Sequence, residues 1–252
     1  TGYTGTSIII DPDNNTSVIL LINAVHPLDG KGVVRLRSLV ANAVAGANCP
    51  APRSYFAHYY KRFLQFMDEP AITSNDIVML GNSLTEGGGD WGKRLGKDNV
   101  INRGISGDVA MGIYDRLHQI LPGKPKKIFL LIGVNDISHD LSTDSIVQMI
   151  EKNVTRIQRE SPETKLYLQS LLPIDESFNR YKKLTNKTYQ IPEINDRLKA
   201  LAKEKKIDFI DLYPLFTEKG TNVLRKELTY DGLHLKEEGY KIWVDAIKKK
   251  MK

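Results

Sequence analysis

The stretch 77-IVMLGNSLTEGG-88 joins an apolar run to a turn that holds Ser83. The apolar run predicts a buried strand, because strands covered on both faces read as continuous hydrophobic segments. Gly81 and Asn82 then predict a turn, after which a helix would begin near Ser83. The carboxyl ends of parallel strands are where α/β proteins hold their ligands. Ser83 is therefore a candidate nucleophile, although ordinary turns also carry serines in this pattern.

Apolar strands and amphipathic helices alternate on both sides of this stretch. The predicted strands span 76–81, 99–102, 126–132, 165–171 and 207–212, and the predicted helices span 88–96, 108–120, 143–160, 190–205 and 236–250. An earlier helix is expected in YFAHYYKRFLQFMDEP, and its aromatic residues are expected to pack in the core. Alternation of this kind predicts an α/β fold, with a five-stranded parallel sheet covered by helices on both faces.

Four short polar motifs follow the predicted strands or precede the last helix. They read GNSLTEGG, NRGISGD, GVND and DGLHL. Because the strands are parallel, we expect these motifs to meet at one edge of the sheet. Acyl transfer needs a nucleophile, a base, a residue that orients the base and hydrogen-bond donors for an oxyanion. The four motifs carry candidates for all of these roles.

His234 is the candidate base for Ser83. Asp231 lies three residues earlier in the same loop, where its carboxylate could select the tautomer of the imidazole ring. The alternative is a helix-cap or core histidine, which is usual for a lone histidine. The other histidines, His26, His58, His118 and His139, lie in a hairpin exit, two predicted helices and a loop, and we expect no comparable pairing there. The backbone N–H of Ser83 is a natural donor for the oxyanion at a helix start.

Together, the four motifs resemble those of the SGNH hydrolases, also called GDSL esterases, over residues 55–252. That resemblance implies a three-layer, flavodoxin-like α/β/α fold and an acyl-enzyme mechanism that uses a triad of Ser83, His234 and Asp231. The family motif usually reads Gly-Asp-Ser, whereas this chain has Asn82 before the serine. That aspartate is not the triad acid, so we expect activity with a shifted pH profile.

The resemblance also implies an oxyanion hole. It would be formed by the backbone N–H groups of Ser83 and Gly107 and the side-chain amide of Asn135. Glycine lets the backbone approach a substrate closely, and a neutral amide donates without titrating. The ordinary alternatives are a turn glycine and a helix-capping asparagine. We expect Asp108 and Asp136 to have structural roles, as helix caps or in holding loops.

The residue sequences of the motifs NRGISGD and YDGLHL are similar to the corresponding motifs of bacterial carbohydrate O-acetylesterases and platelet-activating-factor acetylhydrolase-like enzymes. We therefore expect a serine esterase that removes acetyl or another short acyl group from an oxygen of a glycan or small molecule. The alternatives are a lysophospholipase or thioesterase of the same family, and a non-catalytic carbohydrate-binding module. The sequence carries no metal motif or dinucleotide fingerprint, so no cofactor is expected.

Residues 1–48 form a separate segment. TSIII and SVILLINAV flank the turn DPDNNT and predict a β-hairpin, and VVRLRSLVANAVAGA predicts a helix. The segment resembles the carboxyl-terminal end of a serine β-lactamase or penicillin-binding-protein-like domain, in which Thr1 and Gly2 would end a basic-Thr-Gly motif. The other motifs of that family are missing. We therefore expect a remnant without that chemistry, followed by a linker at 49–54.

Composition narrows the possible partners. The net charge is +6 and the pI about 9.2, but the excess lies partly in the terminal KKKMK, and no motif with interleaved aromatics accompanies it. We therefore expect no nucleic-acid partner, with DNA binding through the lysines as the alternative. The single Cys49 excludes an internal disulfide, and no apolar run is long enough for a membrane span. Because the chain starts at Thr1 and not Met, we expect a missing amino terminus. The resemblance to β-lactamase-like domains and glycan esterases, which usually work outside the cytoplasm, implies a periplasmic or secreted bacterial protein.

Overall fold

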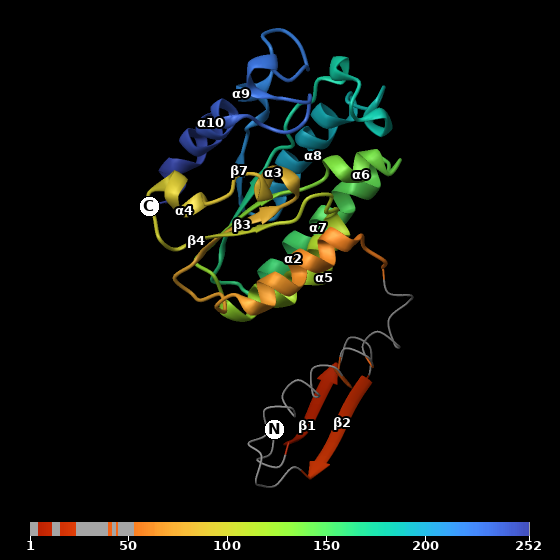
Figure 1. Cartoon of the computed structure of the whole chain (residues 1–252), viewed down its shortest axis with the longest axis vertical. Helices are drawn as coiled ribbons and strands as arrows, with labels where there is room; N and C mark the ends of the chain where they lie inside the picture. Colours follow the sequence, from red (N-terminus) through yellow and green to blue (C-terminus); the bar gives the residue numbers. More distant parts are fainter. Residues whose placement is uncertain (1–4, 12–15, 24–39, 42–43, 45–52, 252) are drawn as a thin grey trace. The chain divides into compact units, whose positions relative to one another are not determined.

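The computed structural model describes residues 5–11, 16–23, 40, 41, 44 and 53–251. The chain divides into two compact units, Thr1–Ser54 and Tyr55–Lys252 (Figure 1). In the first unit, β1 (Gly5–Asp11) and β2 (Thr16–Asn23) pair in antiparallel fashion, which confirms the predicted hairpin. Most of the predicted helix and linker, together with Thr1, Gly2 and Cys49, lie outside the described residues. The β-lactamase-like origin of this unit stays a prediction.

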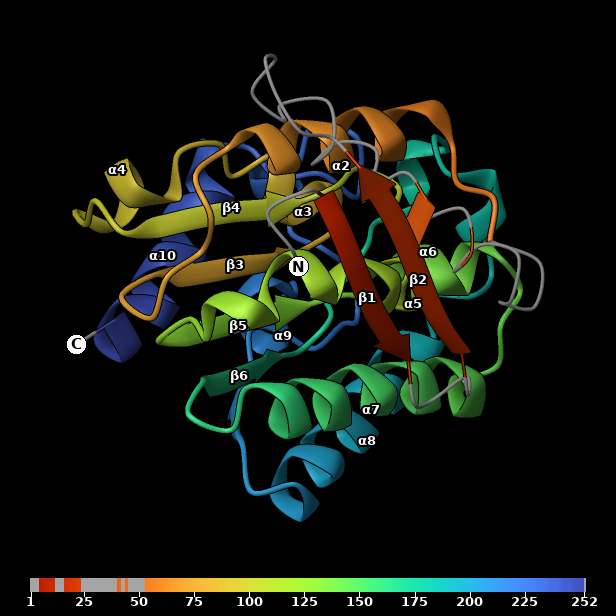
Figure 2. The same cartoon turned by 90° about the horizontal axis from the view of Figure 1, so that it is seen from below.

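The second unit contains the predicted five-stranded parallel sheet. Its strands, in spatial order, are β4 (Val100–Gly104), β3 (Ile77–Gly81), β5 (Lys127–Leu131), β6 (Lys165–Gln169) and β7 (Asp208–Ile210). Figure 2 shows the first four in this order. In chain order this arrangement is 2-1-3-4-5, the flavodoxin-like topology. The order reverses between β3 and β5, so the loops that leave these two strands border a crevice at the carboxyl edge.

Nine α-helices lie in the described part of this unit. They are α2 (Ala57–Asp68), α3 (Ser83–Glu86), α4 (Trp91–Leu95), α5 (Ala110–Arg116), α6 (Val134–Ser138), α7 (Thr143–Glu160), α8 (Gln190–Glu204), α9 (Tyr213–Phe216) and α10 (Glu237–Lys248). The helix α3 is the one expected to begin near Ser83, whereas the sequence did not predict α6 and α9, because helices this short display too little of a helical period. Within the described residues, no helix is both long and apolar enough to cross a membrane.

Helices cover both faces of the sheet, which confirms the three-layer α/β/α architecture. Alternate residues of a strand point to opposite faces. Val78 and Leu80 of β3 pack with α5, α7 and α8, whereas Ile77 and Met79 pack with α4 and α10. Figure 1 shows α4 and α10 on one side of the strands and α7 and α8 on the other. All four of these β3 side chains are buried, as the continuous apolar run predicts.

The helix α2 packs through one stripe only. Tyr59 and Phe66 are buried in a small cluster with Ile105, whereas Tyr60 and Leu64 remain exposed. The Tyr59 hydroxyl donates to the carbonyl of residue 112 at 3.0 Å, which ties α2 to α5. The helix therefore supports the loop after β4, which contains Ile105 and leads into the candidate site.

Candidate active site

Ser83 lies at the first position of α3, directly after β3. Asn82 is the N-cap residue, and its Oδ1 accepts the backbone N–H of Leu84 at 3.0 Å. Gly81 is needed for the tight turn, because a Cβ there would lie 2.4 Å from the carbonyl oxygen of Leu131. The turn thus places the Ser83 hydroxyl at the carboxyl edge of the sheet, beside β5.

The structure brings Ser83, His234 and Asp231 into one hydrogen-bonded chain. The Nε2 of His234 lies 2.9 Å from Ser83 Oγ, and its Nδ1 lies 2.8 Å from Asp231 Oδ2. Asp231 Oδ1 also accepts the backbone N–H groups of Leu233 and His234, at 3.0 and 2.7 Å. Because these bonds fix the carboxylate, it is positioned to orient the ring and stabilise an imidazolium.

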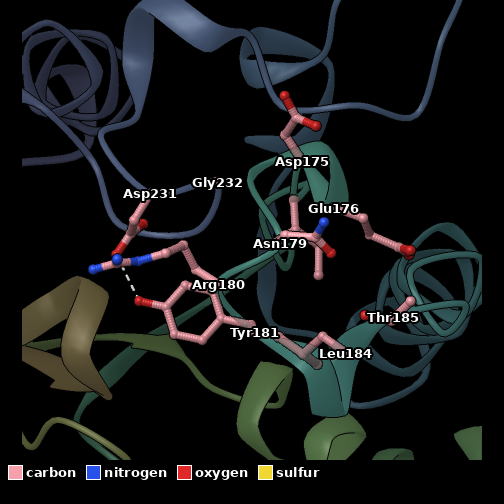
Figure 3. A pocket seen from close by; sticks show the side chains of 10 residues that line it. Asp175, Glu176, Asn179, Arg180, Tyr181, Leu184, Thr185, Asp231 and Gly232 are labelled. Carbon is pink, nitrogen blue, oxygen red and sulfur yellow. Dashed lines mark hydrogen bonds between the residues drawn. The ribbon is translucent and has the colours of Figure 1, made fainter.

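Tyr181 adds a fourth member that the sequence did not reveal. Its hydroxyl donates to Asp231 Oδ2 at 2.5 Å (Figure 3). The same hydroxyl lies 2.8 Å from His234 Nδ1. Burial alone would raise the pKa of Asp231, but hydrogen bonds from Tyr181 and His234 outweigh it and hold that pKa below its usual value. Tyr181 comes from the loop between β6 and α8, fifty residues before Asp231. No motif or spacing in the sequence links the two.

The predicted oxyanion donors line the same groove as Ser83. Gly107 has a φ of +82°, a left-handed backbone conformation that residues with a side chain rarely adopt. The turn after β4 therefore depends on glycine at this position. Asn135 is the second residue of α6, the helix that follows β5. Its Nδ2 donates to the backbone carbonyl of Asp108 at 2.8 Å. That bond leaves the second N–H of the amide available for another acceptor.

Glu86 holds the turn that carries Gly107. Its Oε2 accepts the backbone N–H of Ser106 at 2.5 Å and the Ser106 hydroxyl at 2.7 Å. His58 Nε2 lies 3.0 Å from the same carboxylate, so this histidine does have a carboxylate partner, contrary to what its sequence neighbours indicate. Burial opposes the charge of Glu86, but the bonds from Ser106 and His58 lower the pKa of that carboxyl.

Two buried aspartates stabilise the loops behind the groove. Asp108 Oδ2 accepts from Arg116 Nε at 2.9 Å, and both side chains are fully buried. Arg116 also donates to the carbonyl of Gly81 at 3.0 Å, so the pair links the nucleophile turn to the turn after β4. Burial raises the pKa of Asp108 to about 6 despite this cation. Asp136 accepts the N–H of Ala110 at the start of α5, and burial raises its pKa to about 7.

An open groove of about 520 Å³ gives access to these groups. The side chains and backbone that line it come from the four motifs, from the end of α6 and from the loop that contains Tyr181. They are Ser83, Ser106, Gly107, Asn135, Ser138, Arg180, Tyr181, Lys182, Lys183, Leu184, Leu233 and His234. Within the part of the chain that the structure describes, no cluster of three or more His, Cys, Asp or Glu side chains is arranged to hold a metal ion.

A serine, histidine and aspartate in this geometry, at the carboxyl edge of a parallel sheet, are typical of a serine hydrolase. The model of the GDSL-like lipase/acylhydrolase family matches residues 79–242, and the chain belongs to this family. The match covers all four motifs that the sequence pointed to, from Ser83 to His234. The matched residues therefore form an ester-hydrolase domain.

Two solved structures share this fold. A GDSL-like lipase from Bacteroides thetaiotaomicron is 25% identical, with a TM-score of 0.68, and the match covers 78% of this chain and 98% of that one. An acetyl xylan esterase is 22% identical with a TM-score of 0.59, and the match covers 70% of this chain and all of that one. The second likeness shows the fold alone.

A curated relative from Escherichia coli, N-acylneuraminate cytidylyltransferase, is 26% identical over 177 residues. The match covers 69% of this chain but only 39% of the relative. This chain therefore spans about two-fifths of the length of that protein.

Proposed function

We propose that the protein is a serine esterase that hydrolyses acetyl or other short acyl esters of a carbohydrate. The observation that carries this proposal is the contact of 2.9 Å between His234 Nε2 and Ser83 Oγ, with Asp231 on the far side of the ring. This pair faces an open groove that Gly107 and Asn135 also line. Nucleophile, base and oxyanion donors thus share one accessible surface.

The mechanism follows from these contacts. His234 takes the Ser83 proton as Oγ attacks the ester carbonyl, and the new oxyanion accepts hydrogen bonds from the N–H groups of Ser83 and Gly107 and from the Asn135 amide. The C–O bond to the alcohol then breaks, and His234 returns the proton to that alcohol. Water, deprotonated by His234, attacks the acyl-enzyme in the same way and releases the carboxylic acid and Ser83.

The groove favours a small acyl group on a polar alcohol. The groove is open rather than enclosed, and the aliphatic side chains in its lining are Leu184 and Leu233, so it does not surround a long acyl chain as a tunnel would. Most other lining groups are hydroxyls, an amide and cations, which suit a saccharide. Two of the similar proteins also carry the names of saccharide-directed enzymes, an acetyl xylan esterase and an N-acylneuraminate cytidylyltransferase. These names support the proposal by analogy.

Hydrolysis of p-nitrophenyl esters by the wild-type chain and by Ser83→Ala tests the nucleophile. We expect the acetate ester to be hydrolysed faster than the octanoate ester, and we expect Ser83→Ala to lose a factor of roughly 10³ or more in kcat. Ser74→Ala is the matched control, because Ser74 is exposed and lies in the turn before β3, at the opposite end of that strand. It should retain the wild-type rate.

Other outcomes would select the alternatives. A preference for octanoate would favour a lysophospholipase or thioesterase. Equal rates in the wild type and Ser83→Ala would refute the mechanism, because the serine hydroxyl could not then be the nucleophile. Binding of sugars without hydrolysis of any ester would leave a carbohydrate-binding module as the better reading.

A further inference from the structure

One short segment brings several cations to the catalytic groove. The loop between β6 and α8 contributes Arg180, Lys182 and Lys183, all with exposed side chains, next to Tyr181, which contacts the triad. No aspartate or glutamate belongs to the groove lining. The surface above Ser83 therefore carries positive charge without a compensating carboxylate of its own.

Lys182 and Lys183 form no ion pair with a described carboxylate. Within residues 53–251, neither Lys182 nor Lys183 has a carboxylate oxygen within 4.0 Å. Lys183 does act electrostatically on Asp140, whose pKa is lowered chiefly by its bond to Lys187 and to a smaller extent by Lys183. Asp140 is thus paired with Lys187, and the ammonium group of Lys183 remains accessible to an anion bound in the groove.

Arg180 has a different environment. It also borders a smaller neighbouring pocket, which Asp175, Glu176 and Asp231 line, and its side chain runs past Tyr181 in Figure 3. These carboxylates offset part of its positive charge, although none lies within ion-pair distance. Lys182 and Lys183 are therefore the main source of positive potential in the groove.

From this charge distribution we propose that the groove binds an anionic group, a carboxylate or a phosphate, on the alcohol part of the ester. The inference deepens the proposed function and rests on it. The acyl carbon must lie between Ser83 and the oxyanion donors, so the side of the groove bordered by residues 180–184 is left for the alcohol. Cations there raise the local concentration of an anionic substrate and orient it. The preferred substrates are acylated acidic saccharides.

Matched substrates test this proposal. Acetate release is measured from an O-acetylated methyl glucuronoside and from the corresponding O-acetylated glucuronamide, which has nearly the same size but no charge. An O-acetylated glucose 6-phosphate distinguishes phosphate from carboxylate. We expect kcat/KM for an anionic substrate to exceed that for the amide about tenfold at low salt, since each exposed cation contributes only a few-fold. Because exposed charges are screened, the ratio should fall at 0.5 M NaCl.

Two variants complete the experiment. In Lys182→Gln/Lys183→Gln, the ratio of anionic to neutral substrate should fall to about 2. Lys199→Gln removes an exposed charge from α8, away from the groove lining, and should leave the ratio at its wild-type value. A wild-type ratio near 1, or an unchanged ratio in the double variant, would overturn the inference.

Hydrolysis of p-nitrophenyl acetate separates this inference from the proposed function. That substrate carries no anion, so wild-type activity on it shows a working esterase whatever the ratio is. Activity on the acetate ester with no preference for the charged sugars would overturn the inference alone. No activity on any ester would overturn both. Among the anionic substrates, the faster one identifies the anion as a carboxylate or a phosphate.

Discussion

The buried ion pair between Arg116 and Asp108 provides a strong test of the structure. Both side chains are fully buried, and Arg116 also donates to the carbonyl of Gly81, next to the nucleophile turn. In Arg116→Met, the methionine fills most of the space of the arginine's aliphatic part, but the carboxylate of Asp108 loses its cation. Removing one partner of a buried pair costs about 3–5 kcal/mol, because the remaining charge is left uncompensated. We expect a loss of this size in the free energy of unfolding at pH 8.

The loss should depend on pH in a defined direction. The pKa of Asp108 is about 6 in the folded protein and 3.8 in its ordinary state. Since this pKa is raised on folding, stability falls as the pH rises from about 4 to 6, in wild type and variant alike. Above pH 6 the wild-type carboxylate is charged and the decline stops. Without Arg116 the folded pKa is higher still, so the variant continues to lose about 1.4 kcal/mol per pH unit.

Urea unfolding followed by tryptophan fluorescence measures this effect. The only two tryptophans, Trp91 and Trp243, are fully buried in the second unit, so the signal reports on that unit. Arg197→Met is the control, because Arg197 forms an exposed ion pair with Asp144 and should cost no more than about 1 kcal/mol. The double variant Arg116→Met/Asp108→Asn should recover much of the stability at pH 8, since it leaves no buried charge.

Two results would refute this reasoning. The first is an equal loss of stability in Arg116→Met at pH 5.5 and at pH 8, which would mean that the charge of Asp108 is not what the arginine compensates. The second is a double variant that is less stable at pH 8 than Arg116→Met alone. In that case the carboxylate would itself stabilise the loops, independently of its cation.

Two further predictions concern the candidate active site. Tyr181→Phe should lower kcat for p-nitrophenyl acetate about tenfold. It should also move the acidic limb of the pH–rate profile to higher pH, because Asp231 loses a hydrogen bond that lowers its pKa; an unchanged limb would contradict this positioning role. Asn135→Ala should lower kcat by roughly 10²–10³ with little change in KM, because an oxyanion donor acts mainly in the transition state; a change confined to KM would place the amide in substrate binding.

The fold class and the site motifs could be predicted from residue patterns along the chain. Continuous apolar runs such as IFLLIGV have the length of strands covered on both faces, and their alternation with helical periods implied a parallel sheet. Parallel strands send their carboxyl ends to one edge, so motifs distant in the chain had to meet there. The sequence placed Ser83 at the end of a strand and His234 just before the last helix. In the structure, Ser83 Oγ lies 2.9 Å from His234 Nε2.

The groups that surround this pair could not be predicted, because they depend on how distant segments pack. Tyr181, Glu86 and the Arg116–Asp108 pair act through contacts between segments 8 to 50 residues apart in the chain. Such contacts leave no periodic pattern and no fixed spacing, because each depends on where a loop or helix packs. The charge of the groove is a similar case. Arg180, Lys182 and Lys183 look like an ordinary solvated loop in the sequence, and only the packing of that loop against the triad places their charges beside the nucleophile.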